Sequence, residues 1–221
     1  MRRWLSLVFV VLAVAAGGAF WLYRSTQYVP EFYAAALTMP PEAADRAGDE
    51  FSSNAMTLAG EVRKEGTWSA LFSQDQINGW LTVDLLEKHP ELLPQECAHP
   101  RVRLLDDRAQ VGMKMTLGGV ETIVWLDLEA HMTPEHEIAV RLADVRAGDV
   151  PLPAGEVLDA VTQAAKNLDL SLRWTTVDGA PTAIIGLPPL DADGLTYELR
   201  RLKLSEGGLY VSGTTLRDKK S

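Results

Sequence analysis

Asp127, Glu129 and His131 are the side chains whose types and spacing come nearest to a chemical site. They alternate along the chain, so on a β-strand they would share one face and could bind a cation or relay a proton. Alternation by itself also produces a solvated strand face, and we favour this interpretation. An envelope hydrolase that uses His131 and Asp127 as acid–base groups is therefore the least favoured of three functional hypotheses.

Two pairs of carboxylates, Asp106-Asp107 and Asp191-Ala192-Asp193, could also serve acid–base catalysis. Both pairs fall in predicted turns, where aspartate is favoured because its side chain hydrogen-bonds the local backbone. The sequence contains neither a G-x-S-x-G turn around a serine nor a glycine-rich phosphate loop. We therefore predict no catalytic residue, no cofactor and no enzyme activity.

Cys97 is the only cysteine of the 221 residues, so an intramolecular disulfide is impossible. Cys97 and His99 could supply two metal ligands, but neither His89 nor His136 has a spacing that completes a site. No metal is predicted.

The elements that would position these residues belong to an acidic domain behind a hydrophobic N-terminus. Residues Trp4 to Tyr23 carry no charge, and at about 1.5 Å per helical residue they span roughly 30 Å, the thickness of the bilayer core. Arg2 and Arg3 precede this run and Arg24 follows it, which favours a cytoplasmic N-terminus and an extracytoplasmic domain. The run is thus predicted to be a single-pass anchor in the membrane bilayer.

A cleaved secretory signal is the alternative interpretation of this run. Small residues at Ala13-Val14-Ala15 and Gly17-Gly18-Ala19 have the spacing that a signal peptidase accepts. Both interpretations place the remaining chain outside the cytosol.

The charge of the remaining chain excludes one class of partner. The whole sequence has 21 Lys and Arg against 30 Asp and Glu, and without the three arginines beside the run the charge is near −12. Such a surface repels phosphate backbones, so nucleic acid is excluded as a partner.

Apolar periodicity predicts an α+β domain in which amphipathic helices pack on one mostly antiparallel, twisted sheet. We divide the chain into an anchor (1–24), a linker with a helical stub (25–40) and a single extracytoplasmic domain (41–221). Ser73, with Gln76 in capping-box position, is predicted to begin a helix with Ile77, Trp80, Leu81 and Leu85 on its buried side. The other predicted helices are 31–37, 41–65 and 154–168, and the predicted strands are 68–72, 101–105, 108–117, 120–132, 137–147, 171–177, 182–187, 195–204 and 209–215.

The central strands of this meander present one aliphatic and methionine-rich face. Methionine adapts to irregular shapes and is common on surfaces that accept varied apolar ligands. A core covered by the helices at 41–65 and 154–168 is the competing explanation. The candidate ligand-binding residues are Val111, Met113, Met115, Leu117, Val124, Leu126, Leu128, Ile138, Val140 and Leu142.

Two stretches, Phe72 to Leu81 and Gly148 to Leu158, resemble the YpmS-like family of bacterial membrane-anchored proteins. The resemblance covers about half of the chain and implies an extracytoplasmic anchored domain without an established reaction. Within the first stretch, we interpret Gln76 and Asn78 as cap and surface amides, with Asn78 bound to buried backbone as the alternative.

These observations favour a membrane-anchored extracytoplasmic module that binds a lipid-like ligand or an envelope protein. A structural or assembly role in an envelope complex is the second hypothesis. A short connection to the anchor would hold the domain near lipid or membrane-protein partners and raise their local concentration.

Overall fold

The computed structural model describes residues 18, 20, 21, 23–88, 93, 97–167, 170–186 and 194–217. Most of the predicted anchor Trp4–Tyr23 lies outside the described residues, as does the carboxylate pair Asp191 and Asp193. Within the described part of the chain, no helix combines the length and apolar character needed to cross a membrane.

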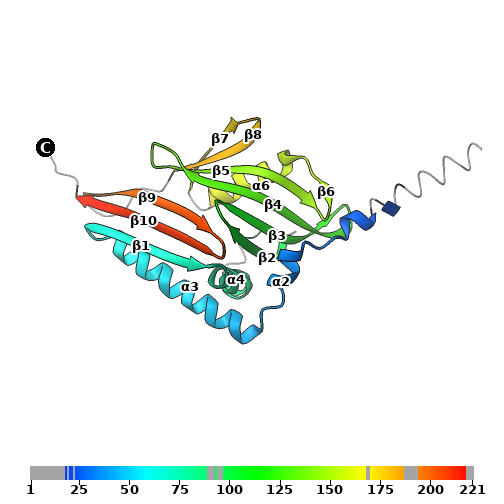
Figure 1. Ribbon diagram of the computed structural model, residues 1–221, viewed down its shortest axis with the longest axis horizontal. Helices are drawn as coiled ribbons and strands as arrows, with labels where there is room; N and C mark the ends of the chain where they lie inside the picture. The colour runs from blue at the N-terminus through cyan, green and yellow to red at the C-terminus, as the bar shows by residue number, and fades with distance from the viewer. Residues whose placement is uncertain are drawn as a thin grey trace, which may run out of the picture.

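The strands form two antiparallel sheets (Figure 1). The small sheet has the order β1 (Gly66–Ser73), β10 (Gly208–Arg217), β9 (Leu195–Ser205). The large sheet has the order β2 (Cys97–Leu105), β3 (Arg108–Leu117), β4 (Val120–Met132), β5 (Ile138–Ala147), β8 (Ala180–Gly186), β7 (Ser171–Val177), and the short β6 (Val150–Pro151) also pairs with β5. The α+β class and the antiparallel pairing are confirmed.

The prediction of one sheet is wrong. The hairpin of β7 and β8 joins the large sheet beside β5, whereas the hairpin of β9 and β10 pairs with β1. Because Trp68 of β1 faces Gly213 of β10, this second sheet depends on residues far apart in sequence. The start of β2 also differs from the prediction, since the strand begins at Cys97 rather than Arg101.

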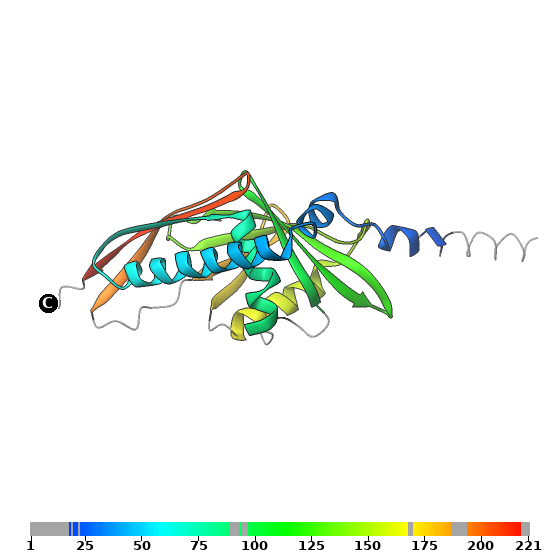
Figure 2. The same ribbon diagram turned by 90° about the horizontal axis from the view of Figure 1, so that it is seen from below.

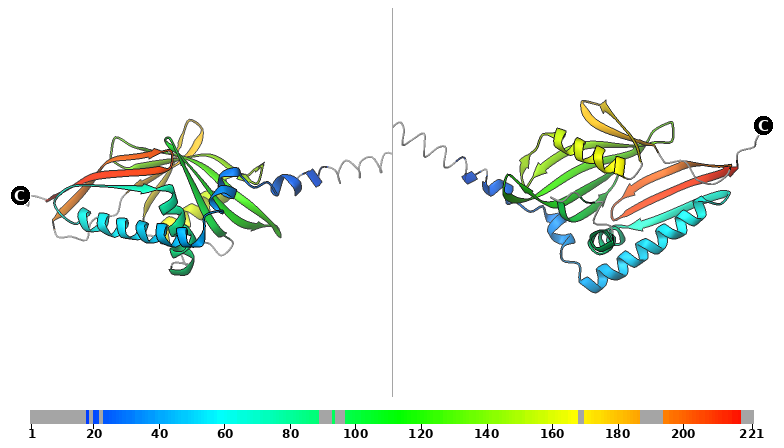
Figure 3. Two further views of the ribbon diagram at one scale, coloured as in Figure 1. Left: turned by 60° about the horizontal axis from the view of Figure 1, so that its bottom comes forward. Right: turned by 180° about the vertical axis from the view of Figure 1, so that it is seen from behind.

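Five helices follow the N-terminal segment in the described part of the chain: α2 (Glu31–Ala36), α3 (Pro41–Val62), α4 (Gln74–Thr82), α5 (Asp84–Lys88) and α6 (Ala154–Asn167). The long α3 runs along the small sheet, whereas α6 crosses the large sheet (Figures 1 and 3). Pro41 begins α3, where its missing N–H costs no helical hydrogen bond. The predicted capping box is confirmed, because the Ser73 and Gln76 side chains each accept from the other residue's backbone N–H.

Helices α3 and α4 cross in close contact at two glycines. A Cβ on Gly79 would lie 2.6 Å from both the Ala44 oxygen and the Gly48 nitrogen. Aromatic rings continue the contact, with the Phe51 ring 5.5 Å from that of Trp80. Only a residue without a side chain allows this approach.

The outer edge of β2 is closed by side-chain amides of α4. Asn78 donates to the Val102 oxygen and accepts from the Val102 nitrogen, both at 2.8 Å, and Gln74 Oε1 accepts from the Leu104 nitrogen at 2.9 Å. Our interpretation of Asn78 as a surface amide is therefore wrong, since it is 2% exposed and occupies the position of a neighbouring strand. An unpaired strand edge invites pairing with other chains, and α4 prevents this.

The two sheets meet where the turn after β9 lies against the turn after β2. The Gly207 nitrogen donates to the Leu104 oxygen at 3.1 Å, and Leu204 packs with Val102 and Leu104 in one buried cluster. A second contact between the sheets involves Glu198 and Leu199 of β9. His136, in the turn before β5, has its Nε2 2.7 Å from Glu198 Oε1 and its Nδ1 3.0 Å from the Leu199 oxygen. The result is an elongated molecule with the described part of the N-terminal segment at one end and the last residues of β10 at the other (Figure 2).

Candidate functional site

The strand register places all ten predicted ligand-binding residues on one face of the large sheet. Val111 pairs with Leu126 and Met113 with Val124, so these side chains project on the same side. Across the next pair, Leu128 faces Leu142 after a bulge that keeps the apolar face continuous. The remaining predicted residues alternate on the same side: Met115, Leu117, Ile138 and Val140.

Helix α6 covers the middle of this apolar face. Leu126, Leu142 and Val145 form a buried cluster against which Leu152, Ala154 and Leu158 pack. Nearer the edge, Trp174 of β7 donates its indole N–H to the Thr162 hydroxyl of α6 at 2.8 Å. This part of the face is a core, as expected for the helix predicted at 154–168. The helix predicted at 41–65 does not cover it, because α3 packs on α4 and β1 instead.

The rest of the face is less completely covered. Only Val124, Leu126 and Leu142 of the ten are buried, and the other seven are half-buried. Met113, Met115 and Leu117 lie toward the β3–β4 turn, and the described buried clusters include none of these three. The face therefore combines a packed centre with an apolar extension that retains contact with solvent.

The opposite face of β4 carries the acidic candidates, and each is neutralised by arginine. Asp127 accepts from Arg108 Nε at 3.1 Å and from Nη2 at 2.6 Å, and only 7% of Asp127 is exposed. Glu129 accepts from Arg141 at 3.0 and 2.5 Å, while His131 is exposed. The prediction that this strand face is solvated is therefore wrong for Asp127, because its carboxylate is buried in a two-point ion pair with Arg108.

The carboxylate pair Asp106-Asp107 and the single cysteine Cys97 are the remaining candidates from the sequence that the structure describes. Asp106-Asp107 forms the β2–β3 turn, with Asp107 at a φ of 56°, which confirms its turn role. Cys97 is half-buried and its thiol is not in a disulfide. Among the described residues, no group of three His, Cys, Asp or Glu side chains is arranged to hold a metal ion.

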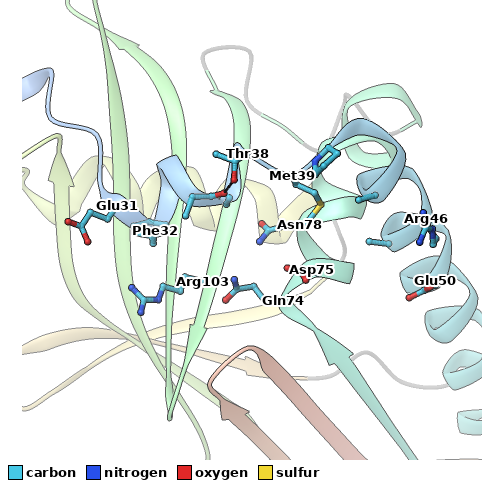
Figure 4. A pocket seen from close by; sticks show the side chains of 15 residues that line it. Glu31, Phe32, Thr38, Met39, Arg46, Glu50, Gln74, Asp75, Asn78 and Arg103 are labelled. Atoms are coloured by element: carbon cyan, nitrogen blue, oxygen red, sulfur yellow. Dashed lines mark hydrogen bonds between the residues drawn. The ribbon is translucent and has the colours of Figure 1, made fainter.

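A hollow of about 750 Å³ between α2, α3, α4 and β2 was not predicted (Figure 4). Small side chains such as Ala43 and Ala47 of α3 form one wall, and Phe32 and Met39 add apolar surface. Its volume is typical of small-molecule sites, which occupy about 300–1,000 Å³. The hollow arises because α2 and α3 diverge from the edge of β2. The apolar pattern of each helix predicts the helix but not its placement relative to β2, so the hollow could not be predicted.

Charged groups of both signs reach this hollow. Arg46 and Arg103 lie on opposite walls, and neither has an ion-pair partner among the described residues (Figure 4). Glu31, Glu50 and Asp75 lie around the same space. The described lining of the hollow therefore presents charges of both signs, and it contains no nucleophile paired with a base.

Behind α2, Tyr33 and Arg101 are buried together. The Tyr33 hydroxyl donates to the His99 oxygen at 2.9 Å, and Arg101 Nη1 donates to the Pro100 oxygen at 2.7 Å. Burial raises the pKa of Tyr33, an effect that the positive charge of Arg101 opposes, and burial lowers the pKa of Arg101. Arg101 Nε is buried without a hydrogen-bond partner in the described part of the chain.

Comparison of the chain with protein-family models, with curated proteins and with solved structures gave no match in any of the three. The resemblance of Phe72–Leu81 and Gly148–Leu158 to the YpmS-like family stays a prediction. The structure gives these stretches physical roles, since the first contains the amides that close β2. The second contains the turn after β5, the short β6 and the first residues of α6.

Proposed function

We propose that the protein is a membrane-anchored, extracytoplasmic module that holds a lipid-like ligand on the apolar face of the large sheet. The half-buried extension formed by Met113, Met115 and Leu117 is the observation that carries this proposal. These side chains continue the face on which α6 already packs, so an acyl chain placed there would extend an existing apolar core.

The free-energy gain from such a ligand would be sufficient for binding. Each buried methylene group contributes about 0.8 kcal/mol, so an acyl chain with ten methylenes on this face gains about 8 kcal/mol before ordering costs. Methionine side chains adjust to chains of different length, which favours a class of amphiphile over one compound.

The test is ligand retention by the full chain. The protein is purified in detergent, exchanged into nanodiscs and titrated with a fluorescent 16-carbon fatty acid, and organic extracts are analysed by mass spectrometry. The wild-type protein should bind the fatty acid, and Met115→Glu should lose most of this binding because a carboxylate would be placed on the apolar face.

Leu71→Glu is the matched control. Leu71 lies on β1 of the small sheet and is 63% exposed, so the same change in chemistry leaves the large sheet untouched. Both variants keep the N-terminal hydrophobic run, so any lipid bound by that run contributes equally to the two measurements. A difference in fatty-acid binding between them therefore comes from the large sheet. Equal binding by both variants, or none by the wild-type protein, would exclude the lipid proposal and favour an assembly role, which crosslinking to a reproducible envelope partner would then test.

A further inference from the structure

Within the N-terminal segment, residues 18, 20, 21 and 23–26 are helical, and the helix ends at Thr26. The Gln27 nitrogen donates to the Arg24 oxygen at 3.2 Å, and the Thr26 hydroxyl donates to the Tyr23 oxygen at 2.8 Å. The last carbonyls of a helix lack partners within it and need donors from elsewhere.

The domain supplies donors to this helix end. The Asp149 nitrogen donates to the Ser25 oxygen at 2.9 Å, and the Thr122 hydroxyl donates to the Thr26 oxygen at 2.6 Å. Gln27 then donates its side-chain amide to the Glu121 oxygen at 3.0 Å. Glu121 and Thr122 belong to the first residues of β4, which extend past the last pair with β5, Val124 with Ala147. Asp149 lies in the turn between β5 and β6.

Gly148 permits the contact. Its φ is 58°, and a Cβ there would lie 2.7 Å from the Thr26 oxygen and closer still to that of Ser25. Its own nitrogen donates to the Ile123 oxygen at 2.8 Å, and its oxygen accepts from the Trp125 indole at 2.8 Å. The helix end therefore fits into a backbone site that only glycine can form.

Exposed aromatic residues surround the same helix end. Trp21 is 67% exposed, Tyr23 54% and Tyr28 44%. The uncharged run ends at Tyr23, and Arg24 follows, so the boundary between hydrocarbon and water would fall at these rings. Tryptophan and tyrosine prefer this interface because one end of each ring system is apolar and the other is polar.

From these contacts we infer that residues 20, 21 and 23–28 are a membrane-docking surface for phospholipid headgroups, and that the helix end fixes the domain in one orientation on the bilayer. The N-terminal segment leaves one end of the long axis, and β10 ends at the other (Figures 1 and 2). The small sheet is then held away from the bilayer, and the β3–β4 turn lies near it. This inference rests on the proposed anchor but not on the proposed ligand.

The test measures energy transfer from the domain to the bilayer. Full-length protein carrying Cys97→Ser is inserted into phosphatidylcholine and phosphatidylglycerol vesicles with an acceptor on the headgroups. The donor is attached to Thr116→Cys, near the β3–β4 turn, or to Leu216→Cys, at the end of β10. A ten-residue strand such as β10 spans about 33 Å, so transfer from residue 116 should exceed transfer from residue 216 several-fold.

Gly148→Ala should remove this difference, because the helix end can no longer dock and the domain reorients freely. Gly119→Ala is the matched control, since Gly119 has a φ of 83° but no atom within 4 Å of its Cβ position. Thr122→Val, which removes one donor and preserves side-chain shape, provides a second test if Gly148→Ala does not fold by circular dichroism.

Three outcomes would overturn the inference: equal transfer from both positions in the wild-type background, no loss of the difference in folded Gly148→Ala or Thr122→Val, or an equal loss in Gly119→Ala. A disulfide between copies carrying Tyr28→Cys, formed in place of lipid contact, would assign this surface to a second copy of the chain. Fatty-acid binding is measured separately, so failure of either proposal leaves the other testable.

Discussion

Replacing Asn78 with alanine should destabilise the domain far more than its position on a helix surface would indicate. The substitution removes two hydrogen bonds of 2.8 Å and leaves the nitrogen and oxygen of Val102 buried without partners. Each unsatisfied buried group costs about 1–3 kcal/mol, so the loss is about 2–6 kcal/mol. Alanine returns about 0.6 kcal/mol through its higher helix propensity.

The expected net loss is about 3 kcal/mol, which reduces the ratio of folded to unfolded protein roughly a hundredfold. The assay is urea unfolding of the full chain in detergent micelles, followed by tryptophan fluorescence and circular dichroism. Asp75→Ala is the control, because Asp75 is exposed on the same helix and its loss should cost under about 1 kcal/mol.

Equal losses for the two variants would refute the argument that Asn78 replaces a neighbouring strand. Asn78→Asp separates the two hydrogen bonds, since aspartate can accept from the Val102 nitrogen but cannot donate to its oxygen. It should therefore be at least as destabilising as Asn78→Ala at neutral pH, because it also buries a charge. A stable Asn78→Asp protein would show that water reaches this edge of β2.

Three further predictions concern other contacts. Gly79→Ala should destabilise the domain by more than about 2 kcal/mol through overpacking, whereas Gly60→Ala, with open space at its Cβ position, should stabilise α3 by about 0.5–1 kcal/mol in the same unfolding assay. Burial raises the pKa of the Tyr33 hydroxyl in the folded protein. The stability linked to this group is therefore fully present below pH ~10, the pKa of an unfolded tyrosine, and is lost as pH rises through the folded pKa. Tyr33→Phe should reduce this loss of unfolding free energy at alkaline pH. Asp127→Asn should cost about 1.5–3 kcal/mol because it weakens the two-point bond to Arg108, whereas His131→Ala should stay within about 0.5 kcal/mol of the wild-type protein.

Features set by neighbouring residues could be predicted from the sequence. The Ser73 and Gln76 capping box needs only four positions, and the Asp178-Gly179 turn is encoded by two residues that accept positive φ. The shared face of Val111 and Leu126 follows from strict alternation on two strands joined by Gly118-Gly119. In each case the physical cause is local, because side-chain period or turn chemistry decides the outcome.

Features that need distant segments could not be predicted. No residue of β1 indicates that it will pair with β10, because alternation shows that a strand forms but not where it pairs. The role of Asn78 depends on Val102, which lies 24 positions away, and the constraint on Gly148 depends on Ser25 and Thr26. The hollow beside α2 likewise results from how three helices and β2 are arranged rather than from any one pattern.

The two proposals meet at the β3–β4 turn. Glu121 and Thr122, just after this turn, hydrogen-bond Gln27 and Thr26, which follow the proposed anchor. Met115 and Leu117, just before the turn, belong to the half-buried apolar extension. A domain fixed in this orientation would therefore present its least covered apolar side chains toward the bilayer. An amphiphile leaving the membrane would then reach the large sheet without crossing the acidic surface of the domain, and the centre covered by α6 would limit how far its chain can enter.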